Sequence, residues 1–354
     1  MQSQDLTLEL QAQVQHAVES RTPLHIIGGN SKAIYGTPTS ATVPLKLTGH
    51  HGIVEYEPSE LVVTVRSGTL LNEINKVLTE HGQMLAFEPP AFSDTASIGG
   101  TIACGFSGPR RPYAGSARDF VLGCTLINGK AERCRFGGQV MKNVAGFDVP
   151  RLMVGALGQL GVLLDVSLRV MPMPEAEITL CHSLASYDDA LESMQRWQGQ
   201  PWPLSALAYD GYVLRMRLSG ADAALKSAAK QLGGEIDKTG DQYWYNLREH
   251  QLDFFKGAEN LWRISIAPAT PMLDIPGRWL LDWGGAQRWL KTPAPASQIH
   301  EQAQTQGGHA ICFRGTEKTD WLRLEPKLMA LHKKIRLAFD PYQLLNPHRF
   351  SPEL

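Results

Sequence analysis

Apolar residues recur along the first half of the chain at spacings that predict both helices and strands. Apolar residues at helical spacing, from Leu6 to Ala17, predict an amphipathic helix over residues 5–19. A second helix is predicted over residues 70–81, where it ends at Gly82. Short apolar runs bounded by turn residues predict strands at 23–27, 53–56, 61–65, 120–128, 131–136 and 162–170.

The second half carries similar patterns in a recognisable order. Between residues 177 and 236 they predict strand, helix, strand, strand, helix and strand, with a hairpin turn at Asp210-Gly211. This βαββαβ order is ferredoxin-like. Beyond it, strands are predicted at 261–267, 278–283 and 309–313, and helices at 298–306 and 322–339.

Residues 88–118 fit neither pattern. They contain Gly99, Gly100, Gly105 and several prolines, which is too much Gly and Pro for a helix or a regular sheet. Apolar residues such as Ile98 and Ile102 argue against disorder. The sequence therefore predicts an ordered, half-buried loop that lies against another part of the molecule.

Composition narrows the classes of protein. The chain has 354 residues, which favours two domains, and its formal net charge of -1 gives no basic footprint for nucleic acid. Its five cysteines include no CxxC pair, so they cannot build a zinc site or an iron–sulfur cluster, and no metal is expected. Free thiols indicate a reducing cytosol. We expect neither a signal peptide nor a membrane span.

Three glycine-rich segments are candidates for binding a phosphate-bearing cofactor. The first is GGNSK, from Gly28 to Lys32, which taken alone is better explained as a plain turn. The second runs from Ser97 to Gly108 and could instead be a tight crossing of two chain segments. The third contains Gly146, Gly155, Gly158 and Gly161, and Asp148 within it is explained as well by capping or turn formation.

Two other groups of residues have competing interpretations. Arg110, Arg111 and Arg118 could attract an anion, or Arg118 could simply pair with Asp119. The aromatic residues of 243–289 could form a surface for a partner subunit, or a small domain packed around indole rings.

The three glycine-rich segments, in this order, resemble the vanillyl-alcohol-oxidase family, whose FAD-binding domain is also called PCMH-type. The residues that carry the resemblance are PLHIIGGNSK, ELVVTVRSGTLLNEINKVL, SIGGTIACGFSG, VAGFD, LGQLGVLLDVSLRVMPMP and the tail FDPYQLLNPHRF. The resemblance implies an α+β protein: a PCMH-type FAD-binding domain of two α/β subdomains over 1–174, then a shortened ferredoxin-like cap domain over 175–315. Residues 316–354 would be a C-terminal helix and a tail that returns to the FAD domain.

The same resemblance implies which residues contact FAD. Gly28, Gly29, Asn30 and Ser31 would contact the pyrophosphate. Further contacts are implied at Ser97, Gly99, Gly100, Thr101, Gly158, Leu160, Gly161, Val162 and Asn346. The first turn contains neither His nor Cys, so we expect non-covalent FAD. The resemblance identifies no catalytic residue.

Segments such as GPRRPYAGSARDFVLG, LWRIS and DWGGAQRWL are similar to the FAD-binding subunits of bacterial glycolate oxidases. This implies an FAD-dependent oxidoreductase acting on CH–OH groups of small 2-hydroxy acids within a heteromeric complex. The implied partners are a larger FAD-containing subunit and an iron–sulfur subunit. The implied location is cytoplasmic, at the inner face of the cell membrane through those partners.

The sequence also departs from relatives that oxidise 2-hydroxy acids themselves. Those relatives carry a His-rich metal motif in the second half, whereas this chain has only GGHA, in which His309 is best explained as a structural residue at a strand start. Two alternatives therefore stay open, namely a stand-alone FAD-dependent dehydrogenase of another substrate and a flavin-free structural subunit.

Overall fold

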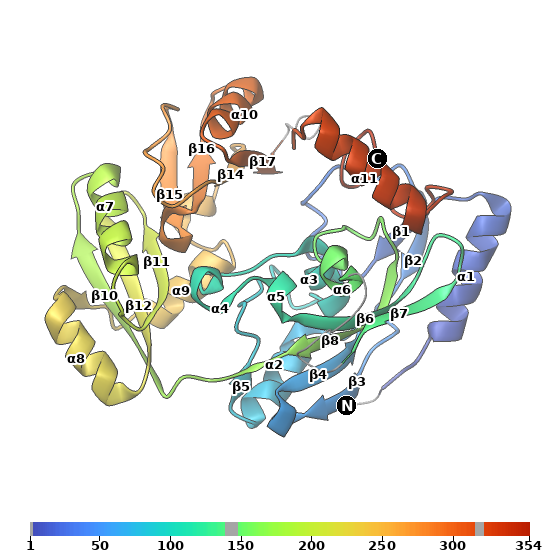
Figure 1. Ribbon diagram of the computed structural model, residues 1–354, viewed down its shortest axis with the longest axis horizontal. Helices are drawn as coiled ribbons and strands as arrows, with labels where there is room; N and C mark the ends of the chain where they lie inside the picture. Colours follow the sequence, from blue (N-terminus) through green and yellow to red (C-terminus); the bar gives the residue numbers. More distant parts are fainter. Residues whose placement is uncertain (1–2, 139–147, 316–321) are drawn as a thin grey trace. The chain divides into compact units, whose positions relative to one another are not determined.

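The computed structural model describes residues 3–138, 148–315 and 322–354, and the chain divides into two compact units (Figure 1). The first unit comprises the chain up to Phe106, Ser116–Met173 and Leu324–Leu354. The second comprises Ser107–Gly115 and Pro174–Arg323. The first unit is thus assembled from three separate stretches of sequence.

The first unit is built around an antiparallel sheet with the strand order β3-β4-β8-β6-β7. Its strands are β3 (Ile53–Glu57), β4 (Val62–Arg66), β6 (Val121–Ile127), β7 (Arg133–Gly137) and β8 (Val162–Arg169). A parallel pair, β1 (Leu24–Ile27) and β2 (Val43–Lys46), and a short antiparallel pair, β5 (Gln83–Met84) and β9 (Met171–Pro172), stand beside it. Most of the strands predicted from apolar runs are confirmed; β2 lacked such a run.

Helices of the first unit form where one face can be buried. They are α1 (Thr7–Ser20), α2 (Leu71–Glu80), α3 (Ile98–Cys104), α5 (Ala117–Phe120), α6 (Val149–Met153) and α11 (Pro326–Phe339). In α1, Leu10, Val14 and Ala17 pack into a core with Leu45 and Val162. The helix ends at Arg21, whose left-handed φ of 54° stops the helical hydrogen bonding.

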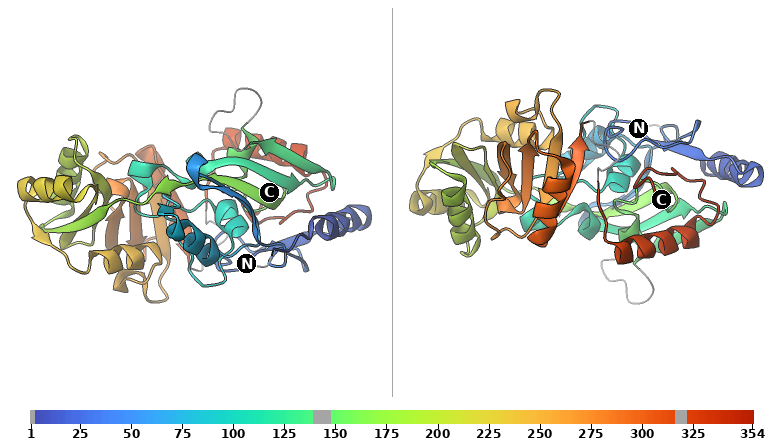
Figure 2. Two further views of the ribbon diagram at one scale, coloured as in Figure 1. Left: turned by 90° about the horizontal axis from the view of Figure 1, so that it is seen from below. Right: turned by 90° about the horizontal axis from the view of Figure 1, so that it is seen from above.

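The second unit contains the ferredoxin-like arrangement predicted from the sequence. Its elements are β10 (Ala176–Ser183), α7 (Tyr187–Gln198), β11 (Leu204–Tyr209), β12 (Val213–Gly220), α8 (Asp222–Leu232) and β13 (Glu235–Ile236). The strands lie in the order β13-β10-β12-β11. Helices α7 and α8 share one core, which includes Leu180, Met216 and Leu218, so both cover the same face of this sheet (Figure 2).

The same sheet continues into the tryptophan-rich region with the order β15-β16-β14-β17. The remaining elements of this unit are α4 (Arg111–Ala114), α9 (Gly240–Arg248), β14 (Leu261–Ser265), β15 (Arg278–Asp282), β16 (Gln287–Lys291), α10 (Ala296–Thr305) and β17 (His309–Arg314). Trp262, Trp279, Trp283 and Trp289 are all buried. This confirms the interpretation of these rings as core packing, and His309 does stand at a strand start.

The loop prediction for residues 88–118 is wrong at α4 (Arg111–Ala114), at the start of α5 and over Ile98–Cys104, which form helix α3. Ser97 caps this helix by accepting a hydrogen bond from the Gly100 N–H, and Gly105 ends it with a φ of 68°. Ile98 and Ile102 are fully buried. Burial of these side chains and the two caps outweigh the low helix propensity of Gly99 and Gly100.

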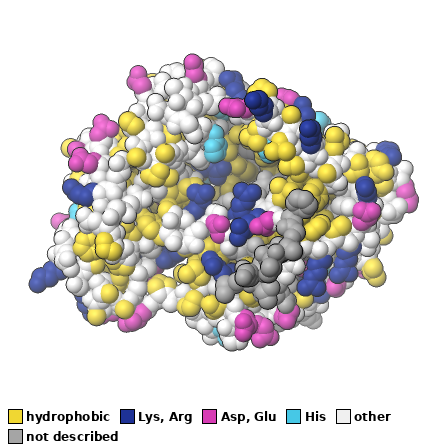
Figure 3. All heavy atoms as spheres, in the orientation of Figure 1, with side chains coloured by type: hydrophobic (Ala, Val, Ile, Leu, Met, Phe, Trp, Pro, Cys, Tyr) yellow, Lys and Arg dark blue, Asp and Glu magenta, His cyan; other side chains and the backbone are white. Residues whose placement is uncertain are grey.

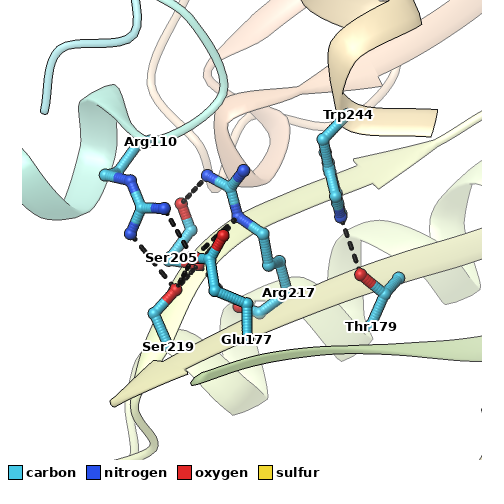
Figure 4. A network of polar contacts seen from close by, with 7 residues as sticks. All are labelled: Arg110, Glu177, Thr179, Ser205, Arg217, Ser219 and Trp244. Carbon is cyan, nitrogen blue, oxygen red and sulfur yellow. Dashed lines mark hydrogen bonds and ion pairs between the residues drawn. The ribbon is translucent and has the colours of Figure 1, made fainter. Parts of the chain in front are cut away.

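The segment 107–115 belongs to the second unit because its side chains contact the ferredoxin-like sheet there. The Arg110 guanidinium lies 2.6 Å from a Glu177 carboxylate oxygen and 3.1 Å from the Ser219 hydroxyl (Figure 4). The Trp283 indole N–H donates to the Gly108 carbonyl at 2.9 Å. An ion pair and a buried hydrogen bond therefore hold this short segment against the sheet.

On the sheet face opposite α7 and α8, the same network continues toward α9. The Ser219 and Ser205 hydroxyls are 2.6 Å apart, and Arg217 donates to Ser205 at 2.9 Å (Figure 4). The Trp244 indole N–H donates to the Thr179 hydroxyl at 2.9 Å. Alternation along β10 and β12 places Thr179 and Arg217 on the face opposite Leu180 and Leu218.

Candidate functional site

One cavity of the first unit is lined by parts of all three glycine-rich segments and by the tail. It has a volume of about 110 Å³ and opens to solvent. The predicted residues that line it are Gly28, Gly29, Asn30, Ser31, Ser97, Gly99, Gly100, Gly158, Gly161 and Asn346. Segments far apart in the sequence therefore meet as expected.

The first turn follows β1 directly. Its backbone is fixed to the second segment, because the Thr95 hydroxyl donates to the Gly29 carbonyl at 2.6 Å and the Gly29 N–H donates to the Ser97 hydroxyl at 3.3 Å. A Cβ on Gly29 would stand 1.4 Å from the Thr95 carbonyl oxygen, and one on Gly28 would stand 2.3 Å from the Ser97 Oγ. Both positions need glycine because two chain segments cross there.

The second segment shows the same close approach. A Cβ on Gly99 would lie 2.6 Å from the Cβ of Ser67 and 2.9 Å from its carbonyl oxygen. The cavity wall is therefore backbone at this point, with Gly99 and Gly100 exposing peptide groups to it. Of the two interpretations offered by the sequence, tight crossing and a cofactor wall, the structure shows the crossing, and the crossing itself produces a wall free of side chains.

The third segment and the tail are joined by the side chain of Asn346. Its amide oxygen accepts from the Ile26 N–H at 2.7 Å, and its amide nitrogen donates to the Leu157 carbonyl at 2.8 Å. A Cβ on Gly158, which has a φ of 76°, would stand 2.7 Å from the Asn346 Nδ2. Asn346 thus connects β1, the turn at 157–158 and the tail.

Three predicted site residues do not line the cavity. Thr101 is buried and its hydroxyl donates to the Ser97 carbonyl at 2.9 Å, within the first turn of α3. Leu160 and Val162 are buried in the protein core.

The motif VAGFD falls partly outside the described residues, since residues 144–147 are among those not described. Its last member, Asp148, caps α6 by accepting a hydrogen bond from the Arg151 N–H at 3.3 Å. The capping interpretation of this aspartate is therefore the one the structure supports.

Two cationic side chains of the cavity were not predicted as site residues. Lys32, which is 6% exposed, and Arg349 both line it. Among the described residues of the lining, none is aspartate or glutamate. Burial and the charge of Arg349 also lower the pKa of His25, another lining residue. Both cations stand inside the sequence motifs already quoted, GGNSK and FDPYQLLNPHRF, which was the available signal.

These features fit an elongated, anionic cofactor. Side-chain-free backbone can approach a ring system or a phosphate closely, the Ser31 and Ser97 hydroxyls can donate to phosphate oxygens, and the cations can offset negative charge. The surface drawn in Figure 3 instead intersperses Lys and Arg with Asp and Glu.

The clustered arginines of the Gly-rich region serve different purposes. Arg110 pairs with Glu177, and Arg111 lies 4.2 Å from the centre of the Trp283 ring. Arg118 is exposed, while the Asp119 carboxylate accepts from Ser116 and closes a capping box at α5. Of these three, none is among the residues that line the cavity.

The described residues contain neither a metal-binding cluster nor a membrane-spanning helix. No group of three or more His, Cys, Asp or Glu side chains there is arranged to hold a metal ion. None of the helices in the described ranges combines the length and apolar character needed to cross a membrane.

The chain is similar to known proteins over its whole length. Residues 6–137 match the family described as "FAD binding domain". Glycolate oxidase subunit GlcE of Escherichia coli (strain K12) is 45% identical over 350 residues, covering 99% of each chain. Glycolate oxidase subunit GlcD of Bacillus subtilis (strain 168) is 29% identical over 178 residues, covering 50% of this chain and 37% of that protein.

A solved structure supports the fold. Alkyldihydroxyacetonephosphate synthase superposes with a TM-score of 0.69 at 15% sequence identity, covering 96% of this chain and 74% of that chain. Together with the match to the FAD-binding family, this confirms the predicted fold class and FAD as the cofactor.

Proposed function

This chain belongs to the family of glycolate oxidase subunit GlcE, and from that membership we propose that it is the FAD-binding subunit of a glycolate oxidase complex. The complex would oxidise glycolate, a 2-hydroxy acid, to glyoxylate. The observation that carries the proposal is the convergence of the glycine-rich segments on one cavity in a chain that is 45% identical to GlcE over 99% of its length.

The proposed cofactor residues are those of the cavity lining. The pyrophosphate would be held by Gly28, Gly29, Asn30 and Ser31. The diphosphate and the ribityl chain would be lined by Ser97, Gly99 and Gly100. The ring system would lie against Gly158 and Gly161. Asn346 would position these segments through its hydrogen bonds to Ile26 and Leu157. When bound, FAD supplies the acceptor for a hydride or for electrons.

We propose that the flavin is bound non-covalently. We also propose that its domain is formed by two separate stretches of the sequence. The predicted FAD domain, residues 1–174, would be completed by residues 316–354, and the cap domain would be residues 175–315. Support comes from the first compact unit, which includes both Ser116–Met173 and Leu324–Leu354.

Partners and location extend the proposal. A larger FAD-containing subunit and an iron–sulfur subunit would take part, because the similar proteins are named as subunits. The iron–sulfur subunit would pass electrons onward, and the complex would act in the cytoplasm at the inner face of the membrane. No catalytic residue is assigned to this chain.

The test compares the purified chain alone with the chain co-expressed with its two proposed partners. The chain alone should be yellow, with absorption bands at about 370 and 450 nm typical of flavin. Acid precipitation should release the flavin into the supernatant, since it is not covalently attached. Glycolate-dependent reduction of a dye should require the partners.

The outcomes separate the alternatives. Glycolate turnover by the chain alone would establish a stand-alone dehydrogenase. A folded but colourless protein that takes up no FAD when the cofactor is supplied in excess would establish a structural subunit without flavin. Either result contradicts the proposal.

A further inference from the structure

Helix α11, drawn in red in Figure 1, presents few of its side chains to the core of its own unit. Of its 14 residues, only Arg336 is buried, with 3% of its surface exposed. None of the three guanidinium nitrogens of Arg336 has a hydrogen-bond partner among the described residues. A helix of this length is marginal in water unless packing covers an apolar face. Within the described part of the chain, that cover is incomplete.

The uncovered apolar side chains of α11 form a stripe. It consists of Leu328, Leu331, Ile335 and Phe339, which we call the leucine stripe. Steps of three, four and four residues bring these side chains to one side of a helix. Leu328 and Leu331 are 43% and 51% exposed, and the other two residues are half-buried. The stripe is therefore a surface that something outside this unit can cover.

The charge of α11 is of one sign. Its sequence, PKLMALHKKIRLAF, contains lysines and an arginine but no aspartate or glutamate. Lys327, Lys333 and Lys334 are exposed. Lys333 lies 2.9 Å from a Glu353 carboxylate oxygen, whereas Lys327 and Lys334 form no ion pair with any described residue. Because successive residues are rotated by about 100° around a helix, these two lysines stand on one flank of the leucine stripe.

We propose that α11 binds an anionic lipid surface, with the leucine stripe at the acyl boundary and the lysines among the headgroups. An apolar face flanked by lysines is the composition of helices that lie in the plane of a membrane interface. At 14 residues, α11 is too short to span a bilayer, which takes about 20. The inference goes beyond the proposed function, in which only the partner subunits would bring the complex to the membrane.

The composition of the exposed face favours lipid over a protein partner. Interfaces between proteins are depleted of lysine and enriched in aromatic side chains. The exposed residues of α11 show the opposite, because they include lysines and leucines but no aromatic ring. Each lysine near an anionic leaflet strengthens binding by about fivefold. The absence of carboxylates from α11 means that no repulsion offsets this attraction along the helix.

The experiment measures sedimentation of the full-length chain with vesicles. Vesicles of phosphatidylcholine and phosphatidylglycerol in equal parts supply the anionic surface, and phosphatidylcholine alone supplies a neutral one. The chain should bind the anionic vesicles about tenfold more tightly, and the difference should shrink as ionic strength rises. Amide hydrogens of α11 should exchange more slowly when the anionic vesicles are present.

Substitutions separate the apolar contribution from the charged one. Leu331→Ser should weaken binding to the anionic vesicles about tenfold, because a side chain at the acyl boundary becomes polar. Lys334→Gln should weaken it about fivefold and reduce its salt dependence. The matched controls are Leu8→Ser, at a 77% exposed position of α1, and Lys76→Gln, at an exposed position of α2. Both controls should bind as the wild type does, and circular dichroism would check that all four variants fold.

Several results would overturn the inference. One is equal binding to anionic and neutral vesicles, and another is binding that neither Leu331→Ser nor Lys334→Gln weakens. Absence of binding to the anionic vesicles would overturn it as well. If Leu331→Ser then weakened assembly with the co-expressed partner subunits, the leucine stripe would be a protein interface instead. Vesicle binding does not depend on flavin colour or glycolate turnover, so this inference and the proposed function fail separately.

Discussion

The glycines at the start of the first loop are required by neighbouring protein atoms. The carbonyl oxygen of Thr95 stands where a Cβ of Gly29 would be, and the hydroxyl of Ser97 stands close to where a Cβ of Gly28 would be. A cofactor wall made of backbone is the consequence of this crossing. The requirement for glycine therefore exists before any ligand binds.

Gly29→Ala should destabilise the folded chain as well as weaken flavin binding. The new Cβ would force apart two backbone segments, and overpacking of this kind costs about 3 kcal/mol. Urea unfolding of the flavin-free chain would measure the loss. Gly199→Ala, whose Cβ has its nearest neighbour at 3.5 Å, should change the free energy of unfolding by less than about 1 kcal/mol. Equal stability of Gly29→Ala and wild type would contradict this explanation.

At this scale the sequence predicted which backbone segments meet but not every side chain that completes the site. The turn predicted at residues 28–31 follows β1, and Gly158 and Gly161 of the backbone wall predicted over residues 158–162 line the cavity. Lys32 and Arg349 were not identified because their role depends on a contact between the tail and the first turn, which no local pattern reveals. Thr101 was misplaced because its motif coincides with an unexpected helix.

Helix α3 and strand β16 show how elements escape local prediction. Glycine content argued against α3, yet its caps and the burial of Ile98 and Ile102 stabilise it. Strand β16, Gln287–Lys291, has polar residues at most positions, so its sequence does not read as a buried strand. All five residues are nevertheless buried, because β14 and β15 pair with it on its two sides. In contrast, the ferredoxin-like elements were predictable because each has a regular apolar pattern and clear turns.

A half-buried histidine in the second unit makes stability depend on pH. His250 stacks on Phe255 with ring centres 4.1 Å apart and touches Trp289 and Phe313. Burial, with the charges of Arg314 and Arg263, lowers the pKa of His250 to about 3. The unfolded chain takes up this proton near pH 6.5, so the stability contributed by the neutral ring is present above that pH. It is lost as pH falls toward 3.

His250→Phe should flatten this pH dependence. Between pH 7 and pH 5 the wild type should lose about 1–2 kcal/mol more unfolding free energy than the variant, as measured by denaturant unfolding. The exposed substitution His16→Phe is the control and should leave the wild-type slope in place. Parallel curves for wild type and His250→Phe would contradict the assignment.

At the scale of the whole molecule, the chain passes between the two units after Phe106, Gly115, Met173 and Arg323. The excursion at 107–115 is held in the second unit by Arg110 and Trp283. It follows the C-terminal end of α3, a helix that lines the cavity at both of its ends. The segment 107–115 is therefore held in the second unit while both of its ends continue into the first unit.

Glu177→Gln should loosen the 107–115 segment. Arg110 is 7% exposed, so removing the charge of Glu177 should lower the free energy of unfolding by about 2 kcal/mol. The loss should be smaller than for a fully buried ion pair, because Glu177 is partly exposed. Trypsin should then cut faster after Arg110, and amide hydrogens of 107–115 should exchange faster.

The matched control is Asp222→Asn, which removes an exposed partner of Lys226. It should leave both rates near wild type, because exposed pairs contribute little. The same exchange rates in Glu177→Gln and wild type would show that the ion pair does not hold the segment.

The tail contacts have a consequence for biosynthesis. Asn346 joins strands and turns made more than a hundred residues earlier, and Arg349 completes the lining of the cavity. During translation, the ribosome would release the glycine turns long before these partners emerge. The nascent chain would therefore expose an unfinished pocket, and cofactor loading would have to wait until Asn346 and Arg349 have left the ribosome.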